Sequence, residues 1–188
     1  MKGDREPSPV SLKFSLCWQK YQEVVRAISE IDNKETIVYF DNWEDMKSYF
    51  DGGVTKYVKE CKPLYSPTPR NWFIKGGSIE ISIDEFRSIW KYTNSSGVSV
   101  SYIDGYIRFD ENSLHPTIPE IDIGEFSGNR ATDISLMLDI LEEQYVLTDV
   151  PDGYVVHHDV NNRILQLVRE DIHREFTHIG GHSMYGGD

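Results

Sequence analysis

Histidines are the residues whose type and spacing could do chemistry in this chain. Five of the six fall within residues 157–182, namely His157, His158, His173, His178 and His182. Imidazole binds divalent transition metals and titrates near neutral pH, so one residue type can hold a metal ion and move protons. Metal-assisted hydrolysis needs both roles. The cluster indicates a hydrolytic metal site, and histidines on a solvated acidic surface are the alternative explanation.

The elements that must position these histidines can be read from the same segment. Residues 154–158 (YVVHH) predict a strand, Asn161-Asn162 predicts a turn, and residues 164–168 (ILQLV) predict the return strand. A helix is expected over residues 169–178, ended by Gly180-Gly181. Strand, turn, strand and helix would form a compact ββα unit.

This unit places limits on which histidines can share one ion. Neighbouring residues on a regular strand point to opposite faces, so His157 and His158 enter one pocket only if the strand ends, twists or bulges there. His178 follows His173 by five residues, about 140° around a helix, so it can join only if the last turn unwinds. The adjacent Gly180-Gly181 favours such unwinding. His157 and His173 are therefore the firmer candidate ligands.

The remaining sequence predicts an α+β fold, with mixed hairpins and helices before this unit. Strands are expected over residues 35–40, 72–74 and 78–82, and a hairpin over 98–109 with Asp104-Gly105 at its turn. Helices are expected over residues 16–31, 84–92 and 131–145. A further helix opens at residues 42–45 and is ended by Gly52-Gly53. Three prolines between residues 62 and 70 indicate an extended connector. The predicted organisation is an N-terminal helical or linker region of unknown role over residues 1–69 and a second domain over 70–188, with the ββα core at 151–182.

Composition excludes several classes of protein. The 188 residues are 39% hydrophobic and 12% aromatic, which excludes wholesale disorder. Two cysteines, Cys17 and Cys61, are too few for a disulfide scaffold or an all-cysteine zinc site. We expect neither a Sec signal nor a membrane anchor, because no apolar stretch approaches the roughly 20 residues that span a bilayer.

Charge constrains the ligands of this chain. The net charge is −12, and residues 121–188 carry 13 acidic side chains against four arginines. Such a field repels phosphates at long range unless a cation or a local basic pocket offsets it. Any site for nucleic acid must therefore concentrate positive charge locally.

Two motifs resemble a known family. Residues Gly153–His182 read GYVVHHDVNNRILQLVREDIHREFTHIGGH, and they resemble nucleases of the HNH/endonuclease VII superfamily with a W-H-H or L-H-H motif, whose pattern is roughly GYxWHHxxxxGxMQLVPxxxHxxxxHxGG. Upstream, FSGNRATD at Phe126–Asp133 is similar to the G-N-R-x-x-D segment that often precedes that motif. The resemblance covers residues 121–188. Departures are Val156 for the aromatic or Leu residue, Arg163 for Gly and Arg169 for Pro, and none removes a histidine.

The resemblance implies a ββα-metal core of the His-Me finger type and a metal-dependent endonuclease that hydrolyses phosphodiester bonds of DNA or RNA. It implies that His158 is the general base and that His157 and His173 bind the divalent ion, with Zn²⁺, Ni²⁺, Mn²⁺ and Mg²⁺ left open. His178 would be a third ligand or a phosphate contact.

The resemblance also implies partners and a phosphate contact, while the other candidate substrate contacts are taken from basic residues close in sequence to the site. Arg130 is a candidate phosphate clamp, or else an ion-pair partner of Asp133; other candidate substrate contacts are Arg163, Arg174 and His182. Members of the family are mostly bacterial toxin effector modules, so the expected partners are nucleic acid and an immunity protein, with a site of action in the cytoplasm or after delivery. The alternative is a non-catalytic acidic binding module, a degenerate nuclease or an immunity-type protein, which the net charge also fits.

Overall fold

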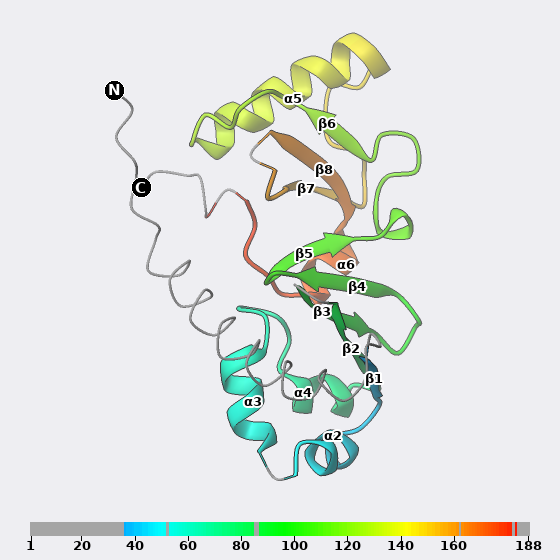
Figure 1. The fold of residues 1–188 in the computed structure, drawn as a ribbon. Helices are drawn as coiled ribbons and strands as arrows, with labels where there is room; N and C mark the ends of the chain where they lie inside the picture. Colours follow the sequence, from blue (N-terminus) through cyan, green and yellow to red (C-terminus); the bar gives the residue numbers. More distant parts are fainter. Residues whose placement is uncertain (1–35, 52, 85–86, 162, 182, 184–188) are drawn as a thin grey trace, which may run out of the picture.

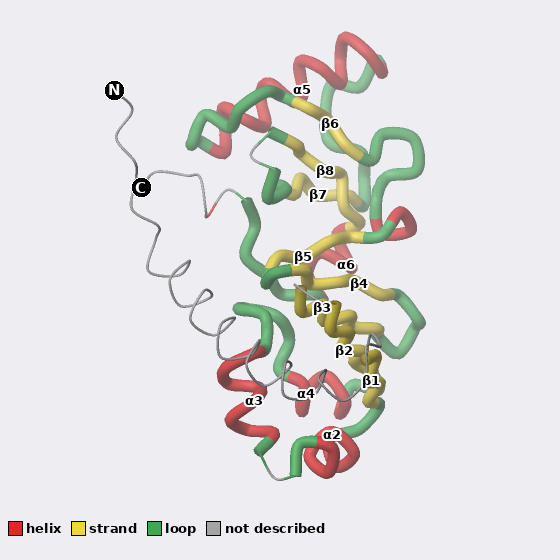
Figure 2. The backbone as a smooth tube through the Cα atoms, in the orientation of Figure 1, coloured by secondary structure: helices red, strands yellow, loops and turns green. Residues whose placement is uncertain are grey.

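The computed structural model describes residues 36–51, 53–84, 87–161, 163–181 and 183. The helix predicted over residues 16–31, the candidate substrate contact His182 and one asparagine of the predicted turn, Asn162, lie outside the described residues. The described chain is a mixture of helices with two antiparallel sheets (Figures 1 and 2). Its helices include none with both the length and the apolar character needed to span a bilayer.

The larger sheet has five strands that pair in sequence order. They are β1 (Thr36–Phe40), β2 (Ser78–Asp84), β3 (Arg87–Thr93), β4 (Ser99–Ile103) and β5 (Tyr106–Phe109). The predicted hairpin is confirmed: Asp104 and Gly105 join β4 to β5 with φ angles of 54° and 87°. A two-residue hairpin turn of this kind needs positive φ at both positions, which Asp-Gly tolerates.

Three short helices complete the core of this sheet. They are α2 (Trp43–Tyr49), α3 (Val54–Cys61) and α4 (Pro69–Ile74), and Figure 1 shows them together near β1 and β2. Asn42 caps α2 by accepting a hydrogen bond from the backbone N–H of Asp45. Met46, Val54 and Trp72 from these helices are buried in one cluster with the sheet residues Trp90 and Tyr92.

Two predicted elements of this region are wrong. Residues 72–74 are helical rather than extended, because Pro69 stands at the first helical position, where its fixed φ favours a helix. Residues 84–92, predicted as a helix, fall mostly in β3, which pairs with β2 and β4 on its two sides. Helix α3 was not predicted at all.

The smaller sheet carries the histidine pair. Its strands are β6 (Glu120–Asp122), β7 (Tyr154–His158) and β8 (Ile164–Arg169), in the order β6-β8-β7, and a short 3₁₀ helix, η1 (Glu111–Ser113), precedes it. Helix α5 (Arg130–Tyr145) lies beside this sheet (Figure 1) and packs Met137 and Leu141 against Leu165 and Leu167. Helix α6 (Glu170–Glu175) follows β8 directly, so the predicted order of two strands and a helix is present. The helix ends at Glu175 and not at the predicted Gly180-Gly181, because Phe176 takes a non-helical conformation.

The end of β8 and the residues of α6 connect the smaller sheet to the core of the larger one. Val168, Ile172 and Phe176 are buried in the cluster of the five-stranded sheet. The ring of Phe176 lies 5.0 Å from that of Trp72, and the Tyr102 hydroxyl donates a hydrogen bond of 2.8 Å to the Thr177 carbonyl. The larger sheet therefore fixes the path of the chain from α6 onward. The division predicted at residue 69 stays a prediction.

Candidate metal centre

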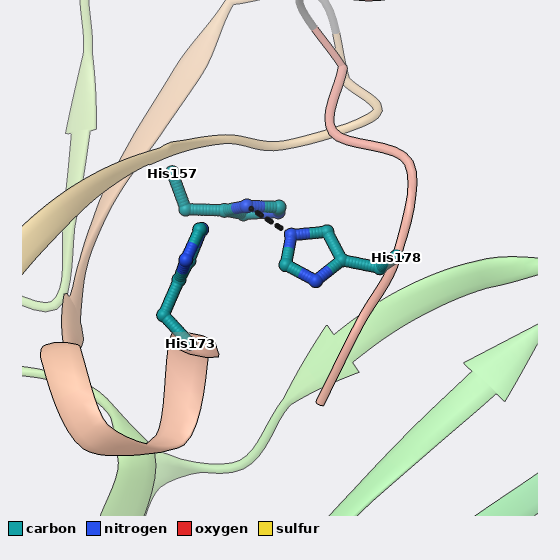
Figure 3. A group of neighbouring side chains, drawn as sticks. All are labelled: His157, His173 and His178. Atoms are coloured by element: carbon teal, nitrogen blue, oxygen red, sulfur yellow. Dashed lines mark hydrogen bonds between the residues drawn. The ribbon is translucent and has the colours of Figure 1, made fainter. Parts of the chain in front are cut away.

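Three imidazoles converge on one point between the two sheets. Figure 3 shows His157 from β7, His173 from α6 and His178 from the segment after α6, with their rings turned toward one another. Their candidate ligand atoms all lie within 4.8 Å of one another. The closest approach joins His178 Nε2 to His157 Nδ1, at 3.2 Å. The three predicted ligands are thus brought together as one group that could hold a metal ion.

His178 reaches this group because α6 ends early. The helix stops at Glu175, and Phe176 takes a non-helical conformation with φ −95° and ψ 89°, so the unwinding that His178 requires does occur. After the turn, His178 Nδ1 donates a hydrogen bond of 2.7 Å to the carbonyl of Phe176, since a carbonyl can only accept. This bond fixes the tautomer and leaves the lone pair on Nε2, the atom that faces His157.

The donor set suits a transition-metal ion. Two nitrogens bound to one tetrahedral ion at about 2.0–2.1 Å lie about 3.3 Å apart, close to the separation of the His178 and His157 nitrogens. Imidazole ligands favour Zn²⁺, Ni²⁺ and similar ions over purely oxygen-seeking ones. Three protein ligands leave coordination positions for water or substrate, as in catalytic rather than structural sites.

The surroundings of the three imidazoles also favour the neutral form that binds a metal ion. Burial holds the pKa of His157 well below its ordinary value, with smaller contributions from His178 and His173. Burial likewise lowers the pKa of His173 to about 4, and it lowers that of His178 against the opposing hydrogen bond to Phe176. Metal ions bind neutral imidazole, so no proton needs to leave these ligands at neutral pH.

Phe109 supports the three rings from the larger sheet. Its ring lies edge-on to His157 and His178, with centroids 5.1 and 5.6 Å away, and nearly parallel to His173 at 6.0 Å. Phe109 ends β5 and is 9% exposed. No role was predicted for Phe109, because an apolar residue at the end of a hairpin strand has the same sequence pattern whether it packs on a core or on metal ligands.

His158 borders the same cavity but has a different partner. The cavity has a volume of about 310 Å³ and is lined by His157, His158, His173 and His178 together with Arg130, Val156, Thr177, Gly180 and Ser183. His158 is the last residue of β7, so both members of the pair reach one cavity where the strand ends. Its Nε2 lies 3.3 Å from Asp133 Oδ2, and both side chains are buried.

Asp133 is oriented by the loop before α5. The backbone N–H and the hydroxyl of Ser127 both donate to Asp133 Oδ1, at 2.8 and 2.7 Å. Burial by itself would raise the pKa of Asp133, but these two hydrogen bonds and the neighbouring His158 bring it below its ordinary value. Asp133 therefore faces Ser127 and His158, and the ion pair with Arg130 considered from the sequence does not describe it. No role at His158 was predicted for Asp133.

The predicted substrate contacts have different positions. Arg130 is exposed at the N-terminus of α5 and lines the cavity. Arg163 instead pairs with Asp122, at 2.7 Å, and Arg174 pairs with Glu170 on α6. Neither of the latter arginines lines the cavity, so Arg130 is the one of these three arginines that does.

The backbone after α6 packs tightly against the residues that follow the histidine pair. Gly181 N–H donates to the carbonyl of His158 at 2.7 Å. A Cβ at Gly181 would lie 2.1 Å from the carbonyl oxygen of Asp159, whereas one at Gly180 would meet nothing nearer than 3.9 Å. The buried carboxylate of Asp159 is held by Arg108 of β5, at 2.7 Å. The larger sheet thus also supports the loop that follows the histidine pair.

The C-terminal segment matches one family model. Residues 148–188 match the family described as "a nuclease of the HNH/ENDO VII superfamily with conserved WHH". The resemblance predicted from the sequence is thereby confirmed, and the matched residues include the histidine pair, His173 and His178. The first turn of α5, which carries Arg130 and Asp133, lies upstream of the match. The curated proteins and the solved structures contain no match to this chain.

Proposed function

We propose that this chain is a metal-dependent nuclease whose reaction takes place in the cavity lined by the histidines. One observation carries the proposal: three imidazoles converge where a fourth, His158, borders the same cavity, within a segment that matches a nuclease family. Phosphodiester hydrolysis needs a base for the attacking water and positive charge at the phosphate. The cavity provides residues suited to each.

His157, His173 and His178 would hold a divalent ion in a ββα-metal arrangement. When bound, the ion would supply positive charge that polarises the scissile phosphate and stabilises the leaving oxygen. The three residues orient that charge because their rings are fixed by Phe109 and by the hydrogen bond from His178 to Phe176. Imidazole ligands favour zinc or nickel over magnesium among the ions considered.

His158 would act as the general base and Arg130 as the phosphate contact. A water in the cavity would give its proton to the imidazole of His158 as its oxygen attacks phosphorus. The guanidinium of Arg130, exposed at the cavity wall, can form charge-assisted hydrogen bonds with the phosphate oxygens. Arg130 and the metal site would provide the local positive charge that an acidic chain needs.

The substrate is then DNA or RNA. The family resemblance favours a role as a toxin effector, with an immunity protein as its partner. An acidic module without catalysis would carry neither a stoichiometric metal ion nor an essential His158. Activity and metal content therefore separate the two functions.

The test is cleavage of plasmid DNA, single-stranded DNA and transfer RNA by the wild type and by His158→Ala, with and without a chelator. We expect the wild type to cut at least one substrate, chelation to stop it, and His158→Ala to lower the rate by about 10²- to 10⁴-fold, because the base is lost. Metal content should stay near wild type. The protein should stay folded with a lower melting temperature, because the substitution leaves a cavity and removes the partner of the buried Asp133 carboxylate. His115→Ala provides the matched control, since His115 is a histidine outside the cavity lining. Full cleavage by His158→Ala would exclude the proposed role.

A further inference from the structure

Asp133 is a buried carboxylate beside the proposed base, and the reaction described above does not use it. Its side chain is 0% exposed and that of His158 is 2% exposed, with Oδ2 and Nε2 separated by 3.3 Å. An ionised carboxylate removed from water is costly unless it is paired or hydrogen-bonded. The imidazole of His158 is the partner that the Oδ2 atom faces.

The side chain of Asp133 is oriented by Ser127, in the loop before α5, and not by His158. Two hydrogen bonds from Ser127 hold Oδ1, which directs Oδ2 toward the imidazole. The Ser127 hydroxyl also accepts a hydrogen bond of 3.1 Å from the backbone N–H of Asn129. The Asn129 side chain caps α5 by accepting from the backbone N–H groups of Ala131 and Thr132. The carboxylate is therefore preorganised.

His158 is also held in place, by its backbone hydrogen bonds and by a neighbouring aromatic ring. Its backbone pairs with Leu165 of β8, and its carbonyl accepts a hydrogen bond from Gly181. The ring of Phe126, from the same loop as Ser127, lies edge-on to the imidazole with centroids 4.9 Å apart. The imidazole thus lies close to an aromatic ring and to a carboxylate, both supplied by residues 126–133.

We propose that Asp133 is the positioning residue for the base, holding His158 in the tautomer that carries its proton on Nε2. This inference rests on the proposed function and deepens it. With the proton on Nε2, valence places the lone pair on Nδ1, which then accepts the proton of the attacking water. The water oxygen bonds to phosphorus, the ester P–O bond breaks, and the leaving oxygen takes a proton from solvent. The imidazolium formed on His158 is stabilised by the carboxylate of Asp133.

Asp133→Asn tests the inference with almost no change of shape. The amide keeps an oxygen for Ser127 and turns its NH₂ group toward His158, so Nε2 must become the acceptor and the proton moves to Nδ1. We expect kcat to fall by about 10²- to 10⁴-fold, as is typical when a base is held in the wrong tautomer. KM and the dissociation constant of the metal should change by less than about threefold, since Asp133 contacts neither the substrate nor the three ligands.

The tautomer itself is measured by ¹⁵N NMR of the histidine side chains in the metal-free protein, which does not depend on activity. We expect the Nε2–H form of His158 in the wild type and the Nδ1–H form in Asp133→Asn. Leu141→Ala is the control for a purely structural role, because Leu141 is buried on the same helix, two turns after Asp133 and outside the cavity lining. It should lower the melting temperature and keep kcat.

The outcomes separate the inference from the proposed function. An unchanged tautomer in Asp133→Asn, or an equal loss of kcat in Leu141→Ala, would overturn the positioning role. The expected tautomers in a wild-type protein that cuts no nucleic acid would support the Asp133 and His158 pairing and overturn the nuclease function.

Discussion

At the scale of single residues, the proposed metal centre depends on a side chain that is not one of its ligands. Phe109 contacts all three imidazole rings from the edge of the larger sheet. Its removal would leave a cavity under the ligands and allow their rings to rotate. Groups that orient metal ligands without touching the ion commonly change metal affinity by about 10- to 100-fold.

Phe109→Ala is therefore expected to weaken metal binding by about 10- to 100-fold and to destabilise the fold by about 3 kcal/mol. Calorimetric metal titration and chemical denaturation measure the two effects. Phe40→Ala is the matched control: Phe40 is buried on β1, at the opposite edge of the same sheet. It should cost similar stability and leave metal affinity unchanged. Equal metal affinity in the wild type and Phe109→Ala would argue against the supporting role.

The sequence was informative for ligands and uninformative for their supports. Histidines are rare and were clustered, so their types and spacing predicted the group that the structure brings together. Phe109 and Asp133 are common residue types that gain a role only through contacts made across more than twenty residues of sequence, with His158 in the case of Asp133. Such contacts depend on tertiary packing, which residue spacing does not contain.

At the scale of elements, the segment after α6 must pass very close to the end of β7. Gly181 allows this approach because it has no Cβ, and a Cβ there would overlap the backbone of Asp159. Backbone cannot move aside as a flexible side chain can. The local structure around the histidine pair therefore requires glycine at 181 and does not require it at 180.

Gly181→Ala should destabilise the protein by more than about 2 kcal/mol, because the segment bearing His178 has to move away from β7. Gly180→Ala, one residue earlier, should be tolerated, since its Cβ would make ordinary contacts. Denaturant unfolding of the two variants measures the difference, and cleavage should follow the same order. Equal stability of the two variants would contradict the close packing of Gly181 against the backbone of Asp159.

Elements with local signals were predicted and elements decided by packing were not. The β4–β5 hairpin has Asp104-Gly105, whose backbone preferences alone favour the turn. In β3, the neighbouring apolar residues Ile89, Trp90 and Tyr92 fit one face of a helix as well as a strand. Pairing with β2 and β4 decides the matter, since Trp90 and Tyr92 are both 0% exposed in the sheet core.

At the scale of the whole molecule, the proposed metal centre lies where the two sheets meet. His157 belongs to the smaller sheet, Phe109 to the larger one, and His173 and His178 to the segment whose core residues pack on the larger sheet. A cation bound there would link parts of the chain far apart in sequence, so binding should stabilise the entire fold through mass action. It would also offset a little of the net charge of −12.

The most direct measurement of the central claim is a metal titration of chelator-treated protein with Zn²⁺ and Ni²⁺, followed by calorimetry, for the wild type and for His157→Ala, His173→Ala and His178→Ala. The account predicts one ion per wild-type chain, with each substitution weakening binding by at least about tenfold, and with His115→Ala binding as the wild type does. A wild-type protein that binds neither ion, or an affinity that none of the three substitutions lowers, would contradict it.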